Sequence, residues 1–224
     1  MRRIAIVGAG QAGCQLALGL RRAGFEVTLV SGRSPAEIRM GPVMSSQCMF
    51  ATALDTEKAL GLDDWSRACP DINGISLTTW SQDREVVSRF AAKLDAPAQS
   101  VDQRVKVAGW IERFVAEGGP LLLRWAEVED LEELARSHDL VVVSTGKGEL
   151  GRLFPLNRAR SSYDRPQRVL ALTYVTGMRP RQGGTAVAFN VVPGVGEYFT
   201  FPALTTTGPC DIMVFEGVPG GPMD

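Results

Sequence analysis

The chain has 224 residues and a net charge of −1, and 45% of its residues are hydrophobic and 22% charged, as in globular proteins of one or two domains. This near-neutral balance gives no electrostatic basis for binding nucleic acid or an anionic membrane surface. A single histidine, His138, argues against a histidine-based metal site or a Ser-His-Asp triad, so we expect no metal.

The cysteines and the N-terminus indicate a cytoplasmic protein. The four cysteines lie far apart without a C-x-x-C pair, so we expect reduced thiols and neither disulfides nor zinc ligands. No apolar run approaches the ~18 residues of a membrane span, and no signal-peptide region of its own precedes the first strand.

Residues 2–30 have the pattern of a βαβ unit. Residues 2–7 are apolar and β-branched like a buried strand, residues 11–23 have a helical pattern that Gly24 ends, and residues 25–30 form a second strand. Between the first strand and the helix lies G-x-G-x-x-G (Gly8-Ala9-Gly10-Gln11-Ala12-Gly13), which lets the backbone approach a pyrophosphate at a helix N-terminus. The complete unit predicts a Rossmann dinucleotide site, against the alternative that the glycines serve only a tight turn.

The end of the second strand lacks an expected acidic residue. Rossmann proteins usually carry Asp or Glu there for the ribose hydroxyls, whereas this chain has Ser31-Gly32-Arg33. We therefore expect Ser31, backbone groups or Arg33 to contact the ribose. Arg33 either binds a 2′-phosphate, which would indicate NADP, or is a solvated loop residue.

The next segment is apolar and sulfur-rich but not periodic. Residues 40–50 either run beneath the reactive end of a cofactor or fill a gap in the core. A helix is predicted over 51–60, a turn and strand over 71–80, and another strand over 86–94. The two strands suggest a small sheet inserted into the Rossmann core.

A third helix is predicted from about residue 104 to residue 117, capped by Ser100 or Asp102. Arg104 lies in its first turn, where a positive charge opposes the helix dipole. Arg104 therefore needs a phosphate or carboxylate partner, or it forms an ordinary surface salt bridge.

The Rossmann pattern continues with a short strand at 121–125, a charged helix at 130–137 and a buried parallel strand at 139–146. This last strand ends in Thr145-Gly146, and its C-terminal edge should face the nucleotide. Lys147 and Glu149 are expected to face solvent.

The C-terminal part is antiparallel in character. An arginine-rich linker over 158–168 precedes a strand at 169–176, a hairpin over 185–201 and a last strand at 211–216. Its aromatic residues could wall an apolar pocket: Phe189, Tyr198, Phe199, Phe201 and Phe215. The Gly/Pro-rich end closes no Rossmann sheet, so we expect a fragment of a longer fold, with weak or no binding of its dinucleotide if the chain ends at Asp224.

Six motifs carry a resemblance to a known family: Gly8–Gly13, Gly32–Pro35, Val101–Arg104, Asp139–Gly148, Arg165–Arg168 and Pro193–Glu197. Over essentially all its length the chain resembles the FAD-dependent oxygenase component of styrene and indole monooxygenases. The resemblance implies an α/β fold, with a Rossmann-type FAD-binding domain and an interleaved, mostly antiparallel β substrate domain. This is the hydroxylase-like flavoprotein fold, here incomplete, because the C-terminal remainder of the family fold is absent. We assign residues 1–40 and 98–155 to the first domain, and 41–97 and 156–224 to the second.

The resemblance also implies a set of FAD-binding residues. The pyrophosphate lies at the glycine loop, Arg104 approaches the flavin, and the Thr145-Gly146 turn passes the adenosine end. The residues expected to bind cofactor are Gly8, Gly10, Gln11, Ala12, Gly13, Ser31, Gly32, Arg33, Arg104, Thr145 and Gly146.

The implied substrate is a small, apolar aromatic alkene or an indole-type molecule. The active-site segment departs from the family, because Pro42 and Ser45 stand where styrene enzymes carry Arg and Asn. The pocket residues we expect are Ser45, Ser46, Gln47, Met49, Phe189, Phe199 and Phe201.

The implied reaction is monooxygenation. Reduced FAD, a cosubstrate supplied by an NADH-dependent flavin reductase, captures O2 as a flavin C4a-peroxide that delivers one oxygen atom to the substrate. No protein nucleophile or acid–base residue is assigned, because this chemistry needs a dry, orienting cavity. A homodimer is left open. The alternatives are an FAD- or NAD(P)-binding oxidoreductase without oxygen insertion and a truncated, non-catalytic nucleotide-binding homologue.

Overall fold

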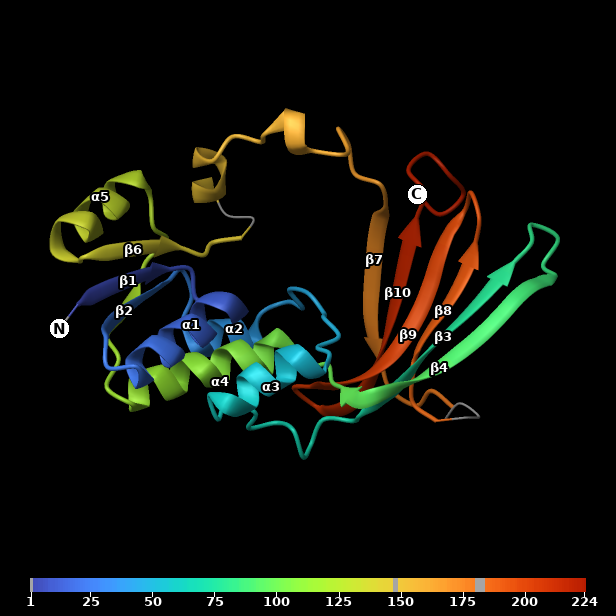
Figure 1. The fold of residues 1–224 in the computed structure, drawn as a ribbon, viewed down its shortest axis with the longest axis horizontal. Coiled ribbons are helices and arrows are strands. Elements are labelled where there is room, and N and C mark those ends of the chain that lie inside the picture. Colours follow the sequence, from blue (N-terminus) through green and yellow to red (C-terminus); the bar gives the residue numbers. More distant parts are fainter. Residues whose placement is uncertain (1, 147–148, 180–183) are drawn as a thin grey trace. The chain divides into compact units, whose positions relative to one another are not determined.

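The computed structural model describes residues 2–146, 149–179 and 184–224. The chain divides into two compact units, both drawn in Figure 1. Unit 1 comprises Met1–Ser45, Thr56–Asp63 and Asp102–Leu156, and unit 2 comprises Ser46–Asp55, Asp64–Val101 and Asn157–Asp224.

Unit 1 is built on a parallel sheet with the strand order β5-β2-β1-β6. Its strands are β1 (Arg3–Val7), β2 (Glu26–Ser31), β5 (Leu121–Leu123) and β6 (Leu140–Val143). The inner strands β1 and β2 pair from Arg3–Glu26 to Val7–Val30, and their apolar residues are almost completely buried. This central pair is the buried parallel core that the sequence predicts.

β6 is less buried than its apolar sequence predicts. The strand pairs with β1 from Ile4–Leu140 to Val7–Val143, but it is the edge strand of the four-stranded sheet. Leu140 is 53% exposed, and the following three valines are half-buried. The prediction of a fully buried strand is therefore wrong here, because an edge strand has one neighbour instead of two.

Residues at their ends explain where two helices of unit 1 begin or end. α1 (Gln11–Arg22) ends at Ala23, and Gly24 follows with φ +87°, a left-handed conformation that glycine adopts without strain. α4 (Gln103–Ala116) is capped by Asp102, whose side chain accepts a hydrogen bond from the Arg104 amide, as one of the two sequence alternatives predicts. α5 (Val128–Ser137) also belongs to unit 1, and the predicted helix α3 (Ala51–Ala59) is divided between the two units after Asp55.

One helix was missed. α2 (Pro35–Met40) follows β2, in a stretch for which no element was predicted. Ser34 accepts a hydrogen bond from the Glu37 amide, while Glu37 accepts one from the Ser34 amide, and Pro35 occupies the first helical position. This capping box, S-x-x-E with proline, is a sequence signal that could have identified the helix.

Unit 2 contains a six-stranded sheet with the order β4-β3-β8-β9-β10-β7. Its strands are β3 (Ile72–Trp80), β4 (Val86–Ala98), β7 (Val169–Val175), β8 (Val187–Val192), β9 (Gly196–Thr205) and β10 (Gly208–Gly217). β3 pairs in parallel with β8, from Ile75–Val187 to Thr79–Val191. The predicted small separate sheet is therefore wrong: β3 and β4 form one side of the larger sheet, to which their backbone hydrogen bonds join them.

The predicted hairpin of β8 and β9 is present, and its aromatic residues lie on both faces of the sheet. Phe189 and Phe199 are cross-strand partners whose ring centroids are 4.6 Å apart. Tyr198 pairs with Phe215 at 5.0 Å on the opposite face, because successive residues of a strand alternate between faces. The five aromatic residues therefore do not wall one pocket, and the structure separates them into two groups.

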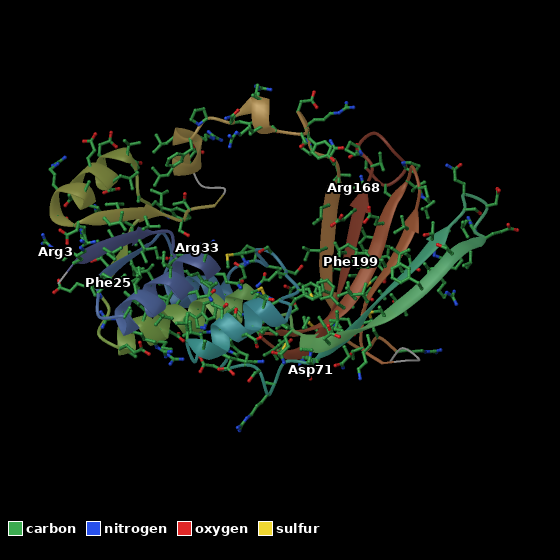
Figure 2. All side chains as sticks on the ribbon, in the orientation of Figure 1. Arg3, Phe25, Arg33, Asp71, Arg168 and Phe199 are labelled. Atoms are coloured by element: carbon green, nitrogen blue, oxygen red, sulfur yellow. The ribbon has the colours of Figure 1, made fainter. Side chains whose placement is uncertain are left out.

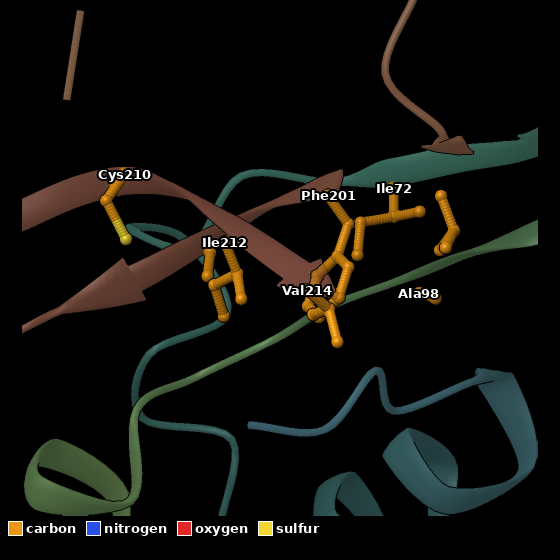
Figure 3. Close-up of a cluster of buried hydrophobic side chains, with 8 residues drawn as sticks. Ile72, Ala98, Phe201, Cys210, Ile212 and Val214 are labelled. Atoms are coloured by element: carbon orange, nitrogen blue, oxygen red, sulfur yellow. The ribbon is translucent and has the colours of Figure 1, made fainter. Parts of the chain in front are cut away.

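The core of unit 2 lies on the face that carries Phe201. Figure 3 shows Phe201, Ile212 and Val214, from neighbouring strands, gathered in this cluster. Cys48, from the sulfur-rich segment, packs against the same cluster together with Phe189 and Phe199. This contact favours the second interpretation of that cysteine, as a residue that fills a gap in the core.

The two units agree with the predicted fold class: a mixed α/β protein with a Rossmann-type parallel sheet and a largely antiparallel second sheet. Unit 1 also takes in residues 56–63, which the sequence analysis placed in the substrate domain. No helix in the described part of the chain is long and apolar enough to span a bilayer.

Candidate functional site

A cavity of about 1200 Å³ opens in unit 1 at the carboxyl ends of the parallel strands. Such an edge is where open α/β sheets bind their ligands. The lining comes from four turns, each following one strand: Val7–Ala12 after β1, Val30–Arg33 around the end of β2, Arg124–Glu129 after β5, and Ser144–Gly146 after β6. Ile38, Met44, Gln103, Val107 and residues 149, 150, 152 and 153 complete it.

The glycine loop has three glycines with three different roles. A Cβ at Gly8, which has φ +115°, would lie 2.4 Å from the Ser144 carbonyl oxygen. A Cβ at Gly13 would lie 1.9 Å from the Gly8 carbonyl oxygen, whereas nothing lies within 4 Å of a Cβ position at Gly10. The first and third glycines thus permit close packing within the fold, and the second keeps open the approach to the backbone.

The start of α1 is suited to an anion. Gly10 is the N-cap and provides no side-chain hydrogen bond to the first amides of the helix. Those amides and the positive end of the helix dipole therefore remain for a ligand such as a pyrophosphate. With the open space over Gly10, this geometry fits the dinucleotide site that the motif predicts. Gln11 and Ala12 line the same part of the cavity.

At the end of β2, where Rossmann proteins usually carry a carboxylate, the chain forms a hydrogen-bonded turn. The Ser31 hydroxyl donates a hydrogen bond to the Arg33 carbonyl oxygen at 2.6 Å, and the Arg33 amide approaches the Ser31 Oγ at 3.3 Å. The Arg33 side chain, labelled in Figure 2, places Nη2 3.2 Å from the Met44 sulfur. Ser31, Gly32 and Arg33 all line the cavity, but the Ser31 hydroxyl proton is used within the turn.

Trp125 lies directly against Gly32. A Cβ at Gly32 would lie 2.6–2.9 Å from Cδ2, Cε3 and Cε2 of the Trp125 indole, so only glycine permits this contact. Trp125 lines the cavity and is 74% exposed. Trp125 was predicted only as the end of a short strand, because the sequence carries no signal that pairs it with Gly32.

Gln103 contributes a polar group to the cavity that was not predicted. Its Nε2 donates a hydrogen bond to the Ser45 hydroxyl at 2.6 Å, which links the start of α4 to the segment after α2. The position was visible within the motif Val101-Asp102-Gln103-Arg104, but the resemblance assigned the cofactor contact to Arg104.

Arg104 is not among the residues that line the cavity. Its Nε and Nη2 donate to Asp102 Oδ2 at 2.9 and 2.7 Å, and Asp102 also caps the helix. The Asp102 side chain is fully buried and that of Arg104 is 18% exposed, so this is not a surface salt bridge. Asp102 is the carboxylate partner that the charge in the first turn requires, and the approach of Arg104 to a flavin stays a prediction.

A buried ion pair lies behind the glycine loop. Lys106 Nζ on α4 contacts both carboxylate oxygens of Glu57 on α3, at 2.7 and 2.9 Å. Gln11 Nε2, at the start of α1, lies 3.4 Å from Glu57 Oε1. The pair therefore connects three helices around the residue that follows Gly10.

The turn after β6 lines the cavity with Thr145 and Gly146, and Gly146 has φ +59°. Lys147 and Gly148 of the predicted motif lie outside the described residues. Glu149 is exposed, as predicted, and its carboxylate accepts a hydrogen bond from Arg152 at 3.0 Å.

The predicted substrate-pocket residues do not line the cavity of unit 1. Ser45 belongs to unit 1 and bonds Gln103, whereas the others belong to unit 2. Met49 forms an isolated antiparallel bridge with Gln99 through two backbone hydrogen bonds. Phe199, labelled in Figure 2, lies on the face of the second sheet, and Phe201 is buried in its core. Ser46 and Gln47 lie in the segment that leads to this bridge.

Comparison with known families matches both parts of the chain. Residues 2–147 match a family model described as "Pyridine nucleotide-disulphide oxidoreductase". Residues 146–224 match one described as "Styrene monooxygenase A putative substrate binding domain".

The curated relatives that the chain matches include styrene monooxygenase StyA of Pseudomonas fluorescens, which is 31% identical over 224 residues. The match covers 100% of this chain and 53% of that protein, so the chain spans about half the length of these relatives.

Solved structures share the fold. The flavin-dependent halogenase CmlS aligns with a TM-score of 0.72 and 15% identity over 98% of this chain and 42% of that one. The flavin-dependent brominase Bmp2 aligns with a TM-score of 0.70 and 14% identity, over 98% and 56% of the two chains. At these identities the likeness concerns the fold alone.

Proposed function

Because the chain belongs to the pyridine nucleotide-disulphide oxidoreductase family and is related along its whole length to styrene monooxygenase, we propose that it is part of an FAD-dependent monooxygenase. The observation that carries the proposal is the glycine loop at the mouth of the cavity. Gly10 leaves space over an uncapped helix N-terminus there, and this suits the pyrophosphate of FAD.

In this proposal unit 1 holds FAD, and the loop and the turns after β2, β5 and β6 surround it. Gly8, Gly10, Gln11 and Ala12 line the cavity and contact the pyrophosphate, and Gly13 permits the close packing behind them. Residues 31–33 and the Thr145-Gly146 turn line the remainder, and Gln103 faces the cavity where Arg104 was expected. The Asp102–Arg104 pair fixes the start of α4, and with it Gln103, at the cavity wall.

The cofactor provides the oxidising chemistry. When bound in its reduced form, FAD would activate O2 and supply one oxygen atom to the substrate. The protein then needs to bind the cofactor, orient the substrate and exclude water, and it needs no acid–base residue. Two of the arginines at this cavity are held in ion pairs, Arg124 with Asp130 and Arg152 with Glu149, which is consistent with that division.

We propose unit 2 as the substrate-binding part. The ring centroids of Phe189 and Phe199 lie 4.6 Å apart with the rings tilted by 35°, and the Phe201 ring lies 6.2 Å from that of Phe199 on the same face. Such a face suits a small aromatic molecule, because aromatic rings attract one another through their edges and offset faces. Ser45, Ser46, Gln47 and Met49 are proposed as further contacts. An aromatic alkene or an indole-type compound is the substrate class that this surface favours.

The proposed system has two components, in which a separate NADH-dependent reductase supplies the reduced FAD. The test supplies chemically reduced FAD in air, with styrene or indole, to the chain and to a form extended to the full length of its relatives. Epoxide or blue indigo supports the proposal. Hydrogen peroxide without an oxygenated product from either form would refute monooxygenation of these substrates.

A second candidate function rests on Arg33. Its guanidinium lies beside the Met44 thioether at the end of β2, where an arginine can bind the 2′-phosphate of NADPH. An oxidoreductase of this kind would take hydride from NADPH without inserting oxygen. Rapid loss of the absorbance of bound FAD on adding NADPH alone, without a reductase, would favour this function over the two-component one.

A further inference from the structure

We propose that the chain recognises the adenosine half of its dinucleotide by stacking the adenine ring on the Trp125 indole, and not by hydrogen-bonding the ribose through a carboxylate. The inference rests on the proposed FAD-binding function and assigns the adenine subsite within it. It also predicts a selectivity: the site is indifferent to the ribose 2′-hydroxyl.

Trp125 lies in direct contact with Gly32, the residue that follows β2. The residue after β2 is normally close to the ribose of a bound dinucleotide. Here a glycine lies at that position, and the indole lies so close that a Cβ would come within 2.6 Å of it. Gly32 has no left-handed backbone conformation that would itself require glycine, so the contact with the indole is the structural reason for glycine here.

Trp125 is exposed although its neighbours in sequence are held in place. The Arg124 amide donates to the Ser31 carbonyl oxygen at 2.9 Å, and the Arg124 guanidinium pairs with Asp130 at the start of α5. On the other side, Ala126 packs against the buried cluster that contains Val30. The backbone of Trp125 is thus held on both sides while its indole stays 74% exposed at the cavity.

The turn after β2 holds no carboxylate that could accept hydrogen bonds from both ribose hydroxyls. The Ser31 hydroxyl already donates to the Arg33 carbonyl oxygen and accepts from the Arg33 amide, and the Arg33 guanidinium can only donate. Glu149 pairs with Arg152. The lining carboxylates that remain are Glu127 and Glu129, which lie beside the start of α5 and not at the end of β2.

A stacked adenine gives a distinct binding profile. Stacking of a base on an aromatic side chain is worth about 1–3 kcal/mol, so removal of the indole should weaken binding about 5- to 150-fold. A carboxylate bound to the ribose would instead make 2′-deoxy-ADP bind about tenfold or more weakly than ADP, because a hydrogen bond to a charged group would be lost.

The test uses the full chain with ADP and 2′-deoxy-ADP as probes, calorimetry for affinity and tryptophan fluorescence for contact. Trp125→Ala, Trp125→Phe and Gly32→Ala are compared with Trp80→Phe in unit 2 as the matched control, and circular dichroism verifies folding. We expect both probes to bind wild type within about threefold of each other and to quench its fluorescence.

The variants separate the outcomes. We expect the Trp80→Phe control to behave like wild type, and Trp125→Phe to keep most of the affinity but lose the quenching. Trp125→Ala and Gly32→Ala should lose affinity about 5- to 150-fold. Unchanged ADP affinity in folded Trp125→Ala overturns the stacking while leaving FAD binding intact. A preference for ADP over 2′-deoxy-ADP that Glu127→Gln or Glu129→Gln abolishes also overturns it. Absence of FAD and ADP binding to folded wild type refutes both this inference and the proposed function.

Discussion

Lys106 and Glu57 form an ion pair whose Nζ–Oε1 distance is 2.7 Å and whose side chains are 1% and 3% exposed. Lys106 Nζ also lies 5.2 Å from the centre of the Trp110 ring, an arrangement that stabilises a desolvated cation. Because Glu57 Oε1 also lies 3.4 Å from Gln11 Nε2, the pair joins α3 and α4 to the first residue of α1, where the glycine loop begins the helix.

Breaking this pair from one side should destabilise unit 1 strongly. Lys106→Met leaves the Glu57 carboxylate buried without its cation, which should cost about 3–5 kcal/mol of unfolding free energy. The double variant Lys106→Met with Glu57→Leu should recover most of that loss, because two apolar side chains of similar volume replace the charges. Urea denaturation measures both. A double variant no more stable than Lys106→Met would contradict this account.

Gly10 and Gly13 should respond to alanine in opposite ways. In Gly13→Ala the new methyl would lie 1.9 Å from the Gly8 carbonyl oxygen, so the fold should lose at least about 1–3 kcal/mol of stability. In Gly10→Ala nothing lies within 4 Å of the methyl, and the weaker N-cap should cost less than about 1 kcal/mol.

FAD affinity separates the two roles further. The Gly10→Ala methyl projects into the space that we assign to the pyrophosphate, so FAD binding should weaken at least about tenfold, or about 1.4 kcal/mol. Thermal melting and titration of FAD fluorescence are the two measurements. Wild-type FAD affinity in Gly10→Ala would place the pyrophosphate elsewhere.

Asp102 should stabilise the start of α4 through two separable interactions. Asp102→Asn keeps an N-cap oxygen but removes the charge partner of Arg104, at a cost of about 1.5–3 kcal/mol. Asp102→Ala removes the cap as well, which should add about 1 kcal/mol.

The exposed pair Arg136–Glu132 on α5 provides the control for this series. Arg136→Gln should cost about 0.5 kcal/mol at most, because exposed i,i+4 pairs contribute little. Denaturant unfolding of the three variants gives the comparison. If Asp102→Asn were no more destabilising than Arg136→Gln, the buried pair would have no special role.

Cys14 and Cys48 should be slow to react with thiol reagents. Burial raises the pKa of the Cys14 thiol to about 12, and burial together with the nearby Cys69 raises the pKa of Cys48 to about 11. Because thiolate is the reactive form, iodoacetamide at about pH 8 should label both slowly in the native protein and rapidly in urea. Peptide mapping by mass spectrometry measures each site, and Cys14 labelled as fast natively as in urea would contradict the prediction.

The same shifts make stability depend on pH in a defined direction. A raised thiol pKa means that the unfolded chain ionises first, near the ordinary value of 9.0, while the folded thiol stays protonated. The contribution of these thiols to the free energy of unfolding is therefore fully present below about pH 9. It is lost as pH rises toward about 11 for Cys48 and 12 for Cys14. Substituting Cys14 with Ala should flatten this alkaline loss in denaturation curves measured across that range.

The sequence determined the parts of this protein whose causes lie within a few residues. The apolar run to Val7, the glycines and the stop at Gly24 specify β1, α1 and β2, and the observed bounds agree to within about two residues. Asp102 could be predicted as a helix cap for the same reason. The capping box at Ser34 carried an equally local signal for α2, which was not used.

The tertiary structure alone decided which segments become neighbours. An apolar run indicates that a strand is buried, but whether β6 has one neighbouring strand or two depends on segments far away in the sequence. The parallel pairing of β3 with β8 joins residues more than a hundred positions apart, and no local sequence pattern predicts such a pairing. The contact between Gly32 and Trp125 belongs to the same class. Periodicity and capping act through covalent geometry over a few residues, whereas burial, pairing and the walls of a cavity arise when the chain closes on itself.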